Sequence, residues 1–281
     1  MTLQERLQDF KKTGFTVFPK ALDDEWVQAM RRRYSELQDR TPSFGQPPPG
    51  AFTDLLELEP QLSLRAITIP EVLDFAEALI GPYVQLESIT ALDNPSQPIE
   101  NARGKVSGWH RDMFGQFPED GHYHRPLLFN AMIYLQDLTE SSGPLRVIPG
   151  SHCAALSLQG DQLNRAHPDE QVLCPRAGDV VLFHSSLLHT GSPNTSGAPR
   201  IFFCVTYNHA WLKYRANYSG PRVQALIHHA HQTRDRRLLR LLGIDDQLFH
   251  RANSGYVVPD EEMWQRWTEE DELQRRRAER P

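Results

Sequence analysis

Val180-Val-Leu-Phe-His-Ser-Ser-Leu-Leu-His189 opens with four apolar residues and closes on a histidine that leads into Thr190-Gly-Ser-Pro-Asn194. A short apolar run bounded by Gly and Pro turn residues is typical of a buried β-strand. His184 ends the run, where a histidine is commonly satisfied in the core or at its rim. His189 follows in the turn-like segment, from which a side chain can project into a cavity. The stretch therefore predicts a buried strand with two candidate histidines at or beyond its end.

Further short β-prone runs lie on both sides of this stretch. They cover residues 84–91, 127–135, 145–148 and 201–207, and a separate run covers residues 15–18. Gly, Pro and Asn turns separate the runs at intervals typical of sandwiches and barrels. No helical pattern lies between consecutive strands, which argues against a parallel doubly wound sheet. We therefore expect an antiparallel β core from about residue 83 to residue 209.

Helices are expected before this core. The first ends at Gly14, and the second can be capped by Asp23 or Asp24. Pro70 suits the first position of a further helix, because it has no N–H to leave unsatisfied, and Gly81 is placed to end that helix.

The remaining segments complete the predicted organisation. Residues 41–50 include three consecutive prolines and predict a surface loop. The basic, leucine-rich residues 234–242 and the charged residues 261–280 are expected to be helices with solvated faces. We find no low-complexity linker, and we expect one domain over residues 1–281. Its core would span about 5–210, with a helical extension over 211–281.

Composition limits the class of protein. The 281 residues are 39% apolar, enough for a sizeable buried core, and no stretch reaches the roughly 18 apolar residues of a membrane span. The polar, mixed-charge start is unlike a secretion signal, and three cysteines are too few for a disulfide framework. The net charge of −6 argues against nucleic-acid binding. The expectation is a soluble, cytoplasmic globular protein.

His110-Arg111-Asp112 is the first candidate for chemistry. On an extended segment, His110 and Asp112 share one face while Arg111 points the opposite way. One imidazole and one carboxylate that converge make two-thirds of a facial metal triad. The tripeptide alone is weak, because His-x-Asp also arises by chance.

A distant strand must supply the third ligand, and His184 and His189 are available. Two histidines and one carboxylate with open coordination positions suit a non-haem Fe(II) oxygenase. A structural zinc site would need four ligands, and the three cysteines are not placed to complete one.

Arg200 lies eleven residues after His189, at the start of an apolar strand. It is either a rim residue paired with a carboxylate or a bidentate clamp for a dicarboxylate co-substrate. Charge balance favours the clamp. Fe(II) with one aspartate keeps about one positive charge, and a bound dianion would overcompensate it unless a cation met its far end.

Together these motifs resemble the phytanoyl-CoA dioxygenase family of Fe(II)- and 2-oxoglutarate-dependent oxygenases. The likeness runs over roughly residues 5–210, in the order that the family shows. It is carried by Phe10-Lys-Lys-Thr-Gly-Phe-Thr-Val-Phe-Pro19, Trp109-His110-Arg111-Asp112, Tyr134-Leu-Gln-Asp-Leu-Thr-Glu-Ser-Ser-Gly-Pro-Leu145 with Val147-Ile-Pro-Gly-Ser-His152, and Gly178-Asp-Val-Val-Leu-Phe183 followed by His189, Pro193-Asn194 and Arg200.

The resemblance implies a mainly β fold with flanking helices, built on a double-stranded β-helix (a jelly-roll, cupin-like core). It implies that His110, Asp112 and His189 bind Fe(II) and that Arg200 grips the distal carboxylate of 2-oxoglutarate, with O2 as the other co-substrate. Asn130 shares strand parity with Met132 and is a candidate contact for the co-substrate.

His152 is expected to be a structural hydrogen-bonding residue of a barrel turn. Gly191 departs from the family, because many members carry a hydroxyl residue two positions after the distal histidine to help hold 2-oxoglutarate. Asp112 is retained, whereas halogenating relatives lack this carboxylate, and its presence favours oxygen transfer.

The implied reaction is hydroxylation of an unactivated C–H bond of a small molecule, a metabolite, natural product or acyl thioester, with release of succinate and CO2. Desaturation, epimerisation and ring formation by the same oxidant are alternatives, and so is a catalytically silent jelly roll that only binds. Trp109, Phe114, Phe117, Tyr123 and His124 are candidates to line the entrance or to pack in the core. Basic clusters at residues 31–33 and 234–240 suit either a coenzyme A phosphate or a solvated helix face.

Overall fold

The computed structural model describes residues 1–38, 51–112, 116–119, 121–213, 218–244, 247–253 and 257–278. The chain forms two compact units, residues 1–53 with 90–205 and residues 54–89 with 206–281. The predicted C-terminal extension thus folds together with an earlier part of the chain. The predicted loop over residues 41–50 lies outside the described residues.

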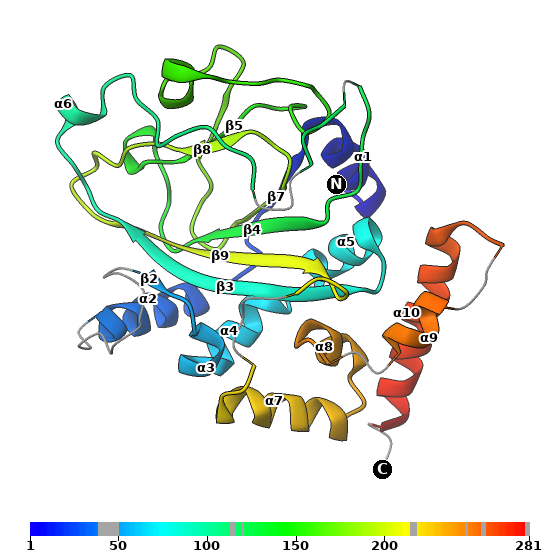
Figure 1. The fold of residues 1–281 in the computed structure, drawn as a ribbon. Coiled ribbons are helices and arrows are strands. Elements are labelled where there is room, and N and C mark those ends of the chain that lie inside the picture. The colour runs from blue at the N-terminus through cyan, green and yellow to red at the C-terminus, as the bar shows by residue number, and fades with distance from the viewer. Residues whose placement is uncertain are drawn as a thin grey trace. The chain divides into compact units, whose positions relative to one another are not determined.

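The first unit contains two sheets (Figure 1). One has the strand order β1-β7-β4-β9-β3-β2 and the other β6-β5-β8. The strands are β1 (Phe15–Phe18), β2 (Ala51–Phe52), β3 (Val84–Asn94), β4 (Leu128–Tyr134), β5 (Leu145–Val147), β6 (Gln171–Leu173), β7 (Val180–His184), β8 (His189–Gly191) and β9 (Arg200–His209). Strands β3 and β9 continue into the second unit.

The strand pairings that position the site are antiparallel, as expected. Strand β7 pairs with β1 on one side and with β4 on the other, and β5 pairs with β6 and β8. The two sheets enclose a common apolar core, to which the larger sheet contributes Tyr134, Val181 and Phe183 and the smaller Leu145 and Val147.

Local sequence signals place the first two helices. Helix α1 (Leu3–Thr13) has a capping box between Thr2 and Glu5 and ends at Gly14, where φ is 85°. A Cβ on Gly14 would lie 2.6 Å from Nδ1 of His152, so the close approach also requires glycine. Helix α2 (Asp24–Gln38) is preceded by Asp23, whose carboxylate caps it by accepting a hydrogen bond from the Trp26 amide at 2.8 Å. Both predicted helices are confirmed.

The second unit is mainly helical. It contains α3 (Leu55–Leu58), α4 (Pro60–Ile67), α5 (Pro70–Ile80), α7 (Pro221–Gln232), α8 (Arg236–Leu241), α9 (Leu248–Asn253) and α10 (Asp260–Ala278), whereas α6 (Ile99–Ala102) and the 3-10 turns Glu140–Ser142 and Gly160–Asn164 belong to the first unit. Helix α5 begins at Pro70 and ends before Gly81, as predicted. A Cβ on Gly81 would lie 2.6 Å from Trp264 of α10, so the missing side chain makes room for the indole.

The predicted C-terminal helices are confirmed, and α10 keeps an exposed charged face, but three charged side chains of this region are buried. Arg240, Arg251 and Asp271 are all nearly inaccessible. Oδ2 of Asp271 lies 2.6 Å from Nη1 of Arg240, and Oδ1 lies 2.7 Å from Nη2 of Arg251. Two guanidinium groups therefore share one buried carboxylate. Burial alone would raise the pKa of Asp271, but these arginines hold it below its usual value. The sequence did not indicate these buried charges, because a buried ion-pair cluster and a solvated face have the same charge pattern.

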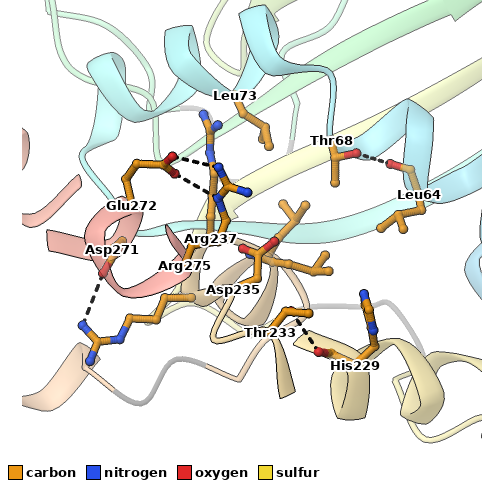
Figure 2. A pocket seen from close by; sticks show the side chains of 13 residues that line it. Leu64, Thr68, Leu73, His229, Thr233, Asp235, Arg237, Asp271, Glu272 and Arg275 are labelled. Atoms are coloured by element: carbon orange, nitrogen blue, oxygen red, sulfur yellow. Dashed lines mark hydrogen bonds and ion pairs between the residues drawn. The ribbon is translucent and has the colours of Figure 1, made fainter. Parts of the chain in front are cut away.

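A cavity of about 450 Å³ lies among α4, α5, α7, α8 and α10 (Figure 2). The arginines that line it stand beside carboxylates: Arg237 is 2.6 Å from Asp74, and Arg275 is 2.8 Å from Glu272. Within residues 234–240, Arg236 and Arg240 pair with Asp271 and Arg237 pairs with Asp74, which weakens the hypothesis of a phosphate site there.

None of the described helices is both long enough and apolar enough to cross a bilayer. The cytoplasmic location remains a prediction.

Candidate active site

Backbone pairing brings the two candidate histidines together. The His110 amide donates to the His189 carbonyl at 3.0 Å, and the His189 amide donates to the His110 carbonyl at 3.0 Å. This is a hydrogen-bonded antiparallel pair, in which opposite residues place their Cα atoms about 5.5 Å apart. Asp112 is fixed two residues further on, where its amide donates to Ser185 O at 2.8 Å. Sequence reasoning treated the segment after His189 as a turn, whereas it forms the short strand β8.

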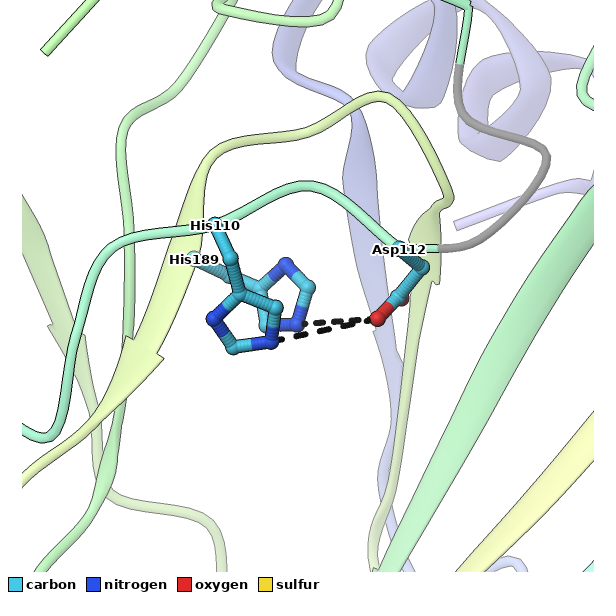
Figure 3. Close-up of side chains that lie close together, drawn as sticks. All are labelled: His110, Asp112 and His189. Atoms are coloured by element: carbon cyan, nitrogen blue, oxygen red, sulfur yellow. Dashed lines mark ion pairs between the residues drawn. The ribbon is translucent and has the colours of Figure 1, made fainter.

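The three side chains converge on one point (Figure 3). Nε2 of His110 is 3.9 Å and Nε2 of His189 is 3.6 Å from Oδ1 of Asp112, and one donor atom from each residue lies within 4.8 Å of the others. Nitrogen and oxygen ligands about 2.0–2.2 Å from one ion can be at most about 4.4 Å apart. Both distances to Asp112 lie within that limit, and the three residues form a group that could hold one metal ion.

Hydrogen bonds define which imidazole nitrogen is free. Nδ1 of His110 lies 2.8 Å from the Gly108 carbonyl, and Nδ1 of His189 lies 3.0 Å from the Leu187 carbonyl. A carbonyl oxygen can only accept, so each Nδ1 carries the proton and each Nε2 keeps its lone pair. Burial lowers the pKa of His189, and the Asp112 carboxylate opposes this shift. Neutral imidazoles are the form that binds a metal ion.

Asn130 contacts the triad directly. Its side-chain amide donates to Oδ2 of Asp112, and its own oxygen lies 3.7 Å from Sγ of Cys204 on β9. Oδ2 is thereby occupied, which leaves Oδ1 facing the imidazoles. The sequence suggested a contact of Asn130 with the co-substrate, which remains a prediction, and no local signal in the sequence indicated its pairing with Asp112.

Arg200 lies at the first residue of β9 and is 7% exposed. Its Cζ is 4.8 Å from the ring centre of Phe202 and 6.0 Å from that of Tyr134. Among the described residues Nε forms no hydrogen bond, and no ion pair joins the guanidinium to a carboxylate. Burial lowers the pKa of Arg200, which Tyr134 opposes. A buried cation without an anion is costly, so this environment favours binding of an anionic ligand.

Arg200 and the triad border the same interior. Tyr134, beside Arg200, belongs to the apolar core cluster that includes Phe183. The Phe183 ring in turn packs on His189, with 4.6 Å between ring centres.

His184 and His152 lie away from the triad, in an aromatic cluster with Tyr123. Nε2 of His184 is 2.9 Å from the His124 carbonyl, and its Nδ1 accepts from the Ser186 amide at 2.9 Å. Both ring nitrogens are thus used within the fold, as expected of a structural histidine. Nε2 of His152 lies 3.1 Å from the Lys11 carbonyl, which agrees with a structural role.

A cavity of about 330 Å³ opens beside His110 and Asp112. Trp109 and Phe117, two of the predicted entrance residues, line it; Trp109 is also buried in an apolar cluster with Leu188. Tyr123 instead packs on His152 and His184, and Phe114 lies outside the described residues.

Gly191 lies on β8 opposite Leu145. A Cβ at Gly191 would be 3.3 Å from the Ser107 hydroxyl. Ser107 therefore brings a hydroxyl close to Gly191, a contact that the sequence did not indicate.

Comparison with known proteins shows the family of the chain. The model of the phytanoyl-CoA dioxygenase family matches residues 10–202. The chain is 27% identical to L-proline trans-4-hydroxylase of Streptomyces griseoviridis, covering 71% of this chain and 84% of that enzyme. It is 24% identical to ectoine dioxygenase of Bordetella parapertussis, covering 73% and 74% respectively. An uncharacterised protein of Mycobacterium tuberculosis is 24% identical over 94% of this chain and 96% of its own length.

Solved structures confirm the fold. HygX of Streptomyces hygroscopicus, crystallised with nickel and 2-oxoglutarate, matches with a TM-score of 0.60 at 20% identity, covering 76% of this chain and 89% of HygX. SnoN, a non-haem α-ketoglutarate-dependent epimerase from nogalamycin biosynthesis, matches with a TM-score of 0.55 at 19% identity, covering 78% and 94%. At these identities the likeness establishes the jelly-roll architecture alone.

Proposed function

Because this chain belongs to the phytanoyl-CoA dioxygenase family, we propose that it is an Fe(II)- and 2-oxoglutarate-dependent dioxygenase that hydroxylates an unactivated C–H bond of a small molecule. The observation that carries the proposal is the convergence of the His110, Asp112 and His189 side chains, with one donor atom of each within 4.8 Å of the others. Two histidines and one carboxylate with open positions are the ligand set of non-haem Fe(II) oxygenases.

The protein's own part in the reaction begins with the ligands. Nε2 of His110, Nε2 of His189 and Oδ1 of Asp112 hold Fe(II), while the carbonyls of Gly108 and Leu187 fix the two imidazole rings. Asn130 keeps Oδ2 of Asp112 engaged and so orients the carboxylate. Iron with 2-oxoglutarate and O2 supplies the oxidising power for C–H cleavage, with succinate and CO2 as co-products.

Arg200 receives the distal carboxylate of 2-oxoglutarate. Its guanidinium is buried, held by aromatic faces, and separate from any described carboxylate partner. A bound dicarboxylate would supply the missing negative charge in a site with little water, where charge-assisted hydrogen bonds are strong.

Substrate positioning decides the outcome of the reaction. Apolar residues line the cavity beside His110, and the orientation of a substrate bound there determines which C–H bond reacts. Desaturation, epimerisation and ring formation remain alternatives for the same site, because they differ in how the substrate is held. The proposed mechanism needs no side chain as a general base.

The decisive experiment is an anaerobic titration of the metal-free protein with Fe(II) and 2-oxoglutarate. We expect a charge-transfer absorption band that saturates at one Fe(II) per chain, and succinate release when O2 is admitted. His110→Ala, Asp112→Ala and His189→Ala should lose the band and the metal. His228→Ala, on the exposed face of α7, is the matched histidine control and should retain both.

A silent binding module would show neither metal uptake nor succinate. If His184→Ala loses iron while His189→Ala keeps it, the ligand assignment is wrong.

Arg200→Ala separates the co-substrate from the metal. Loss of a buried charge-assisted contact costs about 2–5 kcal/mol, so we expect the 2-oxoglutarate concentration needed for half-saturation of the band to rise at least about tenfold. Fe(II) affinity without 2-oxoglutarate should not change. Arg165→Ala, which removes an exposed side chain, is the control. Unchanged 2-oxoglutarate affinity in Arg200→Ala would rule out the clamp.

A further inference from the structure

The cavity beside the triad has an apolar, preformed wall. Its volume of about 330 Å³ lies at the small end of ligand pockets, which run from about 300 to 1,000 Å³. Besides His110 and Asp112, the residues that matter for its chemistry are Trp109, Arg111, Phe117, Leu158, Leu163 and Leu188.

Main-chain hydrogen bonds fix this wall. The Trp109 amide donates to the Leu163 carbonyl at 2.8 Å, and the Trp109 indole N–H donates to the Arg165 carbonyl at 2.8 Å. The Leu188 amide donates to the Ser151 hydroxyl at 2.8 Å. The Trp109 indole and the backbone at Leu163 and Leu188 are therefore held in place before any ligand binds.

Although alternation along the segment predicts that Arg111 points away from His110 and Asp112, Arg111 also lines this cavity and carries a positive charge. Its Nε donates to the Ser186 carbonyl at 2.8 Å, and its Nη2 donates to the Ser151 carbonyl at 3.1 Å and lies 3.4 Å from the Ala154 carbonyl. These acceptors are neutral, so they orient the guanidinium without cancelling its charge. Cζ also lies 5.1 Å from the ring centre of Phe117.

Arg111 differs from Arg146 and Arg165 in its pairing with carboxylates. Arg146 pairs with Glu170 and Arg165 pairs with Asp161. Among the residues that the structure describes, no carboxylate forms an ion pair with Arg111, and no hydrogen bond engages its Nη1. The acidic residue of the lining, Asp112, is directed to the imidazoles and to Asn130.

We propose that this cavity binds a small organic carboxylate, such as an amino acid or a short carboxylic acid, as the substrate. Its carboxylate pairs with Arg111, its carbon skeleton lies along Leu158, Leu163 and Leu188, and a C–H bond faces His110 and Asp112. This inference rests on the proposed function and adds the substrate class.

Size and charge both limit the alternatives. An acyl-coenzyme A could place only its acyl end in a cavity of about 330 Å³. Arg200 lies in different surroundings, between Tyr134 and Phe202, so the carboxylates of substrate and co-substrate have separate cationic partners.

Binding can be measured without turnover. The protein loaded anaerobically with Fe(II) and 2-oxoglutarate is titrated with matched pairs of compounds, each a small carboxylic acid or amino acid and its primary amide. Ring and branched aliphatic skeletons that fit the cavity form the panel. The readout is the shift of the charge-transfer band, which reports a substrate entering beside the metal. We expect at least one acid to shift the band saturably and its amide to bind at least tenfold more weakly.

Variants then assign the preference to Arg111. Arg111→Gln should bind the acid as weakly as the amide while keeping the Fe(II)–2-oxoglutarate band, and Arg111→Lys should keep part of the preference. Arg165→Gln is the matched control. The Arg165 carbonyl accepts the hydrogen bond from Trp109, and the Arg165 side chain is 70% exposed, so the substitution leaves that bond in place. This variant should behave as the unmodified protein.

Different results would overturn the inference and the proposed function. Three results would each overturn the inference: equal binding of acids and amides, absence of any band shift across the panel, or an unchanged acid preference in Arg111→Gln. In each case, the presence of the Fe(II)–2-oxoglutarate band would still support the proposed function. If Arg111→Gln does not fold, the acid–amide comparison in the unmodified protein and in Arg111→Lys still decides. Failure of the band itself would overturn the proposed function, and the inference with it.

Discussion

Asp112 uses its two carboxylate oxygens differently. Oδ1 lies 3.6 Å from Nε2 of His189 and 3.9 Å from Nε2 of His110, whereas Oδ2 accepts a hydrogen bond from Asn130. A carboxylate held by a neighbouring amide loses rotational freedom, so its remaining oxygen is already aimed before a metal binds.

Asn130→Ala should weaken metal binding. The loss of a hydrogen-bonding partner of a ligand commonly costs about 10–100-fold in metal affinity. We expect a decrease of that size in anaerobic Fe(II) titrations, or with Mn(II) as a redox-silent probe, while 2-oxoglutarate affinity at saturating metal changes little. Asn101→Ala, on the exposed helix α6, is the control. The opposite result, normal metal affinity with weak 2-oxoglutarate binding, would mean that Asn130 serves the co-substrate, as its strand parity first suggested.

His184 should make folding stability depend on pH. Burial lowers its pKa to about 4 from 6.5, so the unfolded chain takes up the proton first as the pH falls. Stability from this residue is fully present above about pH 6.5 and is lost toward pH 4, by up to about 3 kcal/mol. Urea unfolding of the metal-free protein between pH 7 and 4.5 measures this slope.

His184→Gln should show a smaller slope than the unmodified protein, because glutamine does not titrate. The metal ligands His110 and His189 are present in both proteins, so their contribution cancels in the comparison. An equal slope in both proteins would show that His184 is not the residue responsible.

At the scale of elements, helix α10 is anchored by buried charge as well as by its indoles. Trp264 and Trp267 pack with Tyr83, and Asp271 lies between Arg240 and Arg251. Removing one member of such a cluster leaves the others buried without compensation.

Asp271→Asn should therefore be strongly destabilising, by about 3–5 kcal/mol. Glu270→Gln changes the neighbouring carboxylate, which is 56% exposed and 3.3 Å from Arg251, and should cost less than about 1 kcal/mol. Urea unfolding of the two variants side by side gives both values. Similar losses in the two variants would mean that the buried position of Asp271 adds nothing.

The elements that the sequence predicted well are those whose ends depend on local chemistry. Helix α5 begins at a proline and ends before a glycine, and α1 and α2 begin at side-chain caps; each of these signals acts within one turn. Strand β8 was missed because three residues acquire strand geometry only by pairing with β5 and with His110.

The candidate site divides in the same way. The residue types and order of His110, Asp112, His189 and Arg200 were readable from the sequence. The hydrogen bond from Asn130 to Asp112, the approach of Ser107 to Gly191 and the neutral acceptors of Arg111 depend on which segments lie side by side. A linear sequence does not encode those contacts in any local pattern.

For the whole molecule, metal and co-substrate should act as folding ligands. A ligand that binds only the folded state stabilises it by about 2.7 kcal/mol at 100 times its dissociation constant. For a chain of this length that corresponds to a rise in Tm of roughly 5 °C. Thermal unfolding with Mn(II) and 2-oxoglutarate should show the rise, and a chelator should reverse it.

Asp112→Ala should lose this stabilisation while unfolding normally without ligands. If the two compact units melt separately, only the transition of residues 1–53 and 90–205, which contain the triad, should move. A shift of both independent transitions, or an equal shift in Asp112→Ala, would mean that the metal acts elsewhere.

The exchange of main-chain hydrogen bonds between His110 and His189 has a consequence for how this protein can diverge. Because side chains alternate along paired strands, inserting a single residue next to either histidine would turn an imidazole to the opposite face and destroy the site. Insertions in the loop between β5 and β6, which carries Leu158 and Leu163 of the cavity beside the triad, leave that register untouched. This loop can therefore change in length and sequence, in evolution or by design, and so accept new substrates while the iron ligands stay the same.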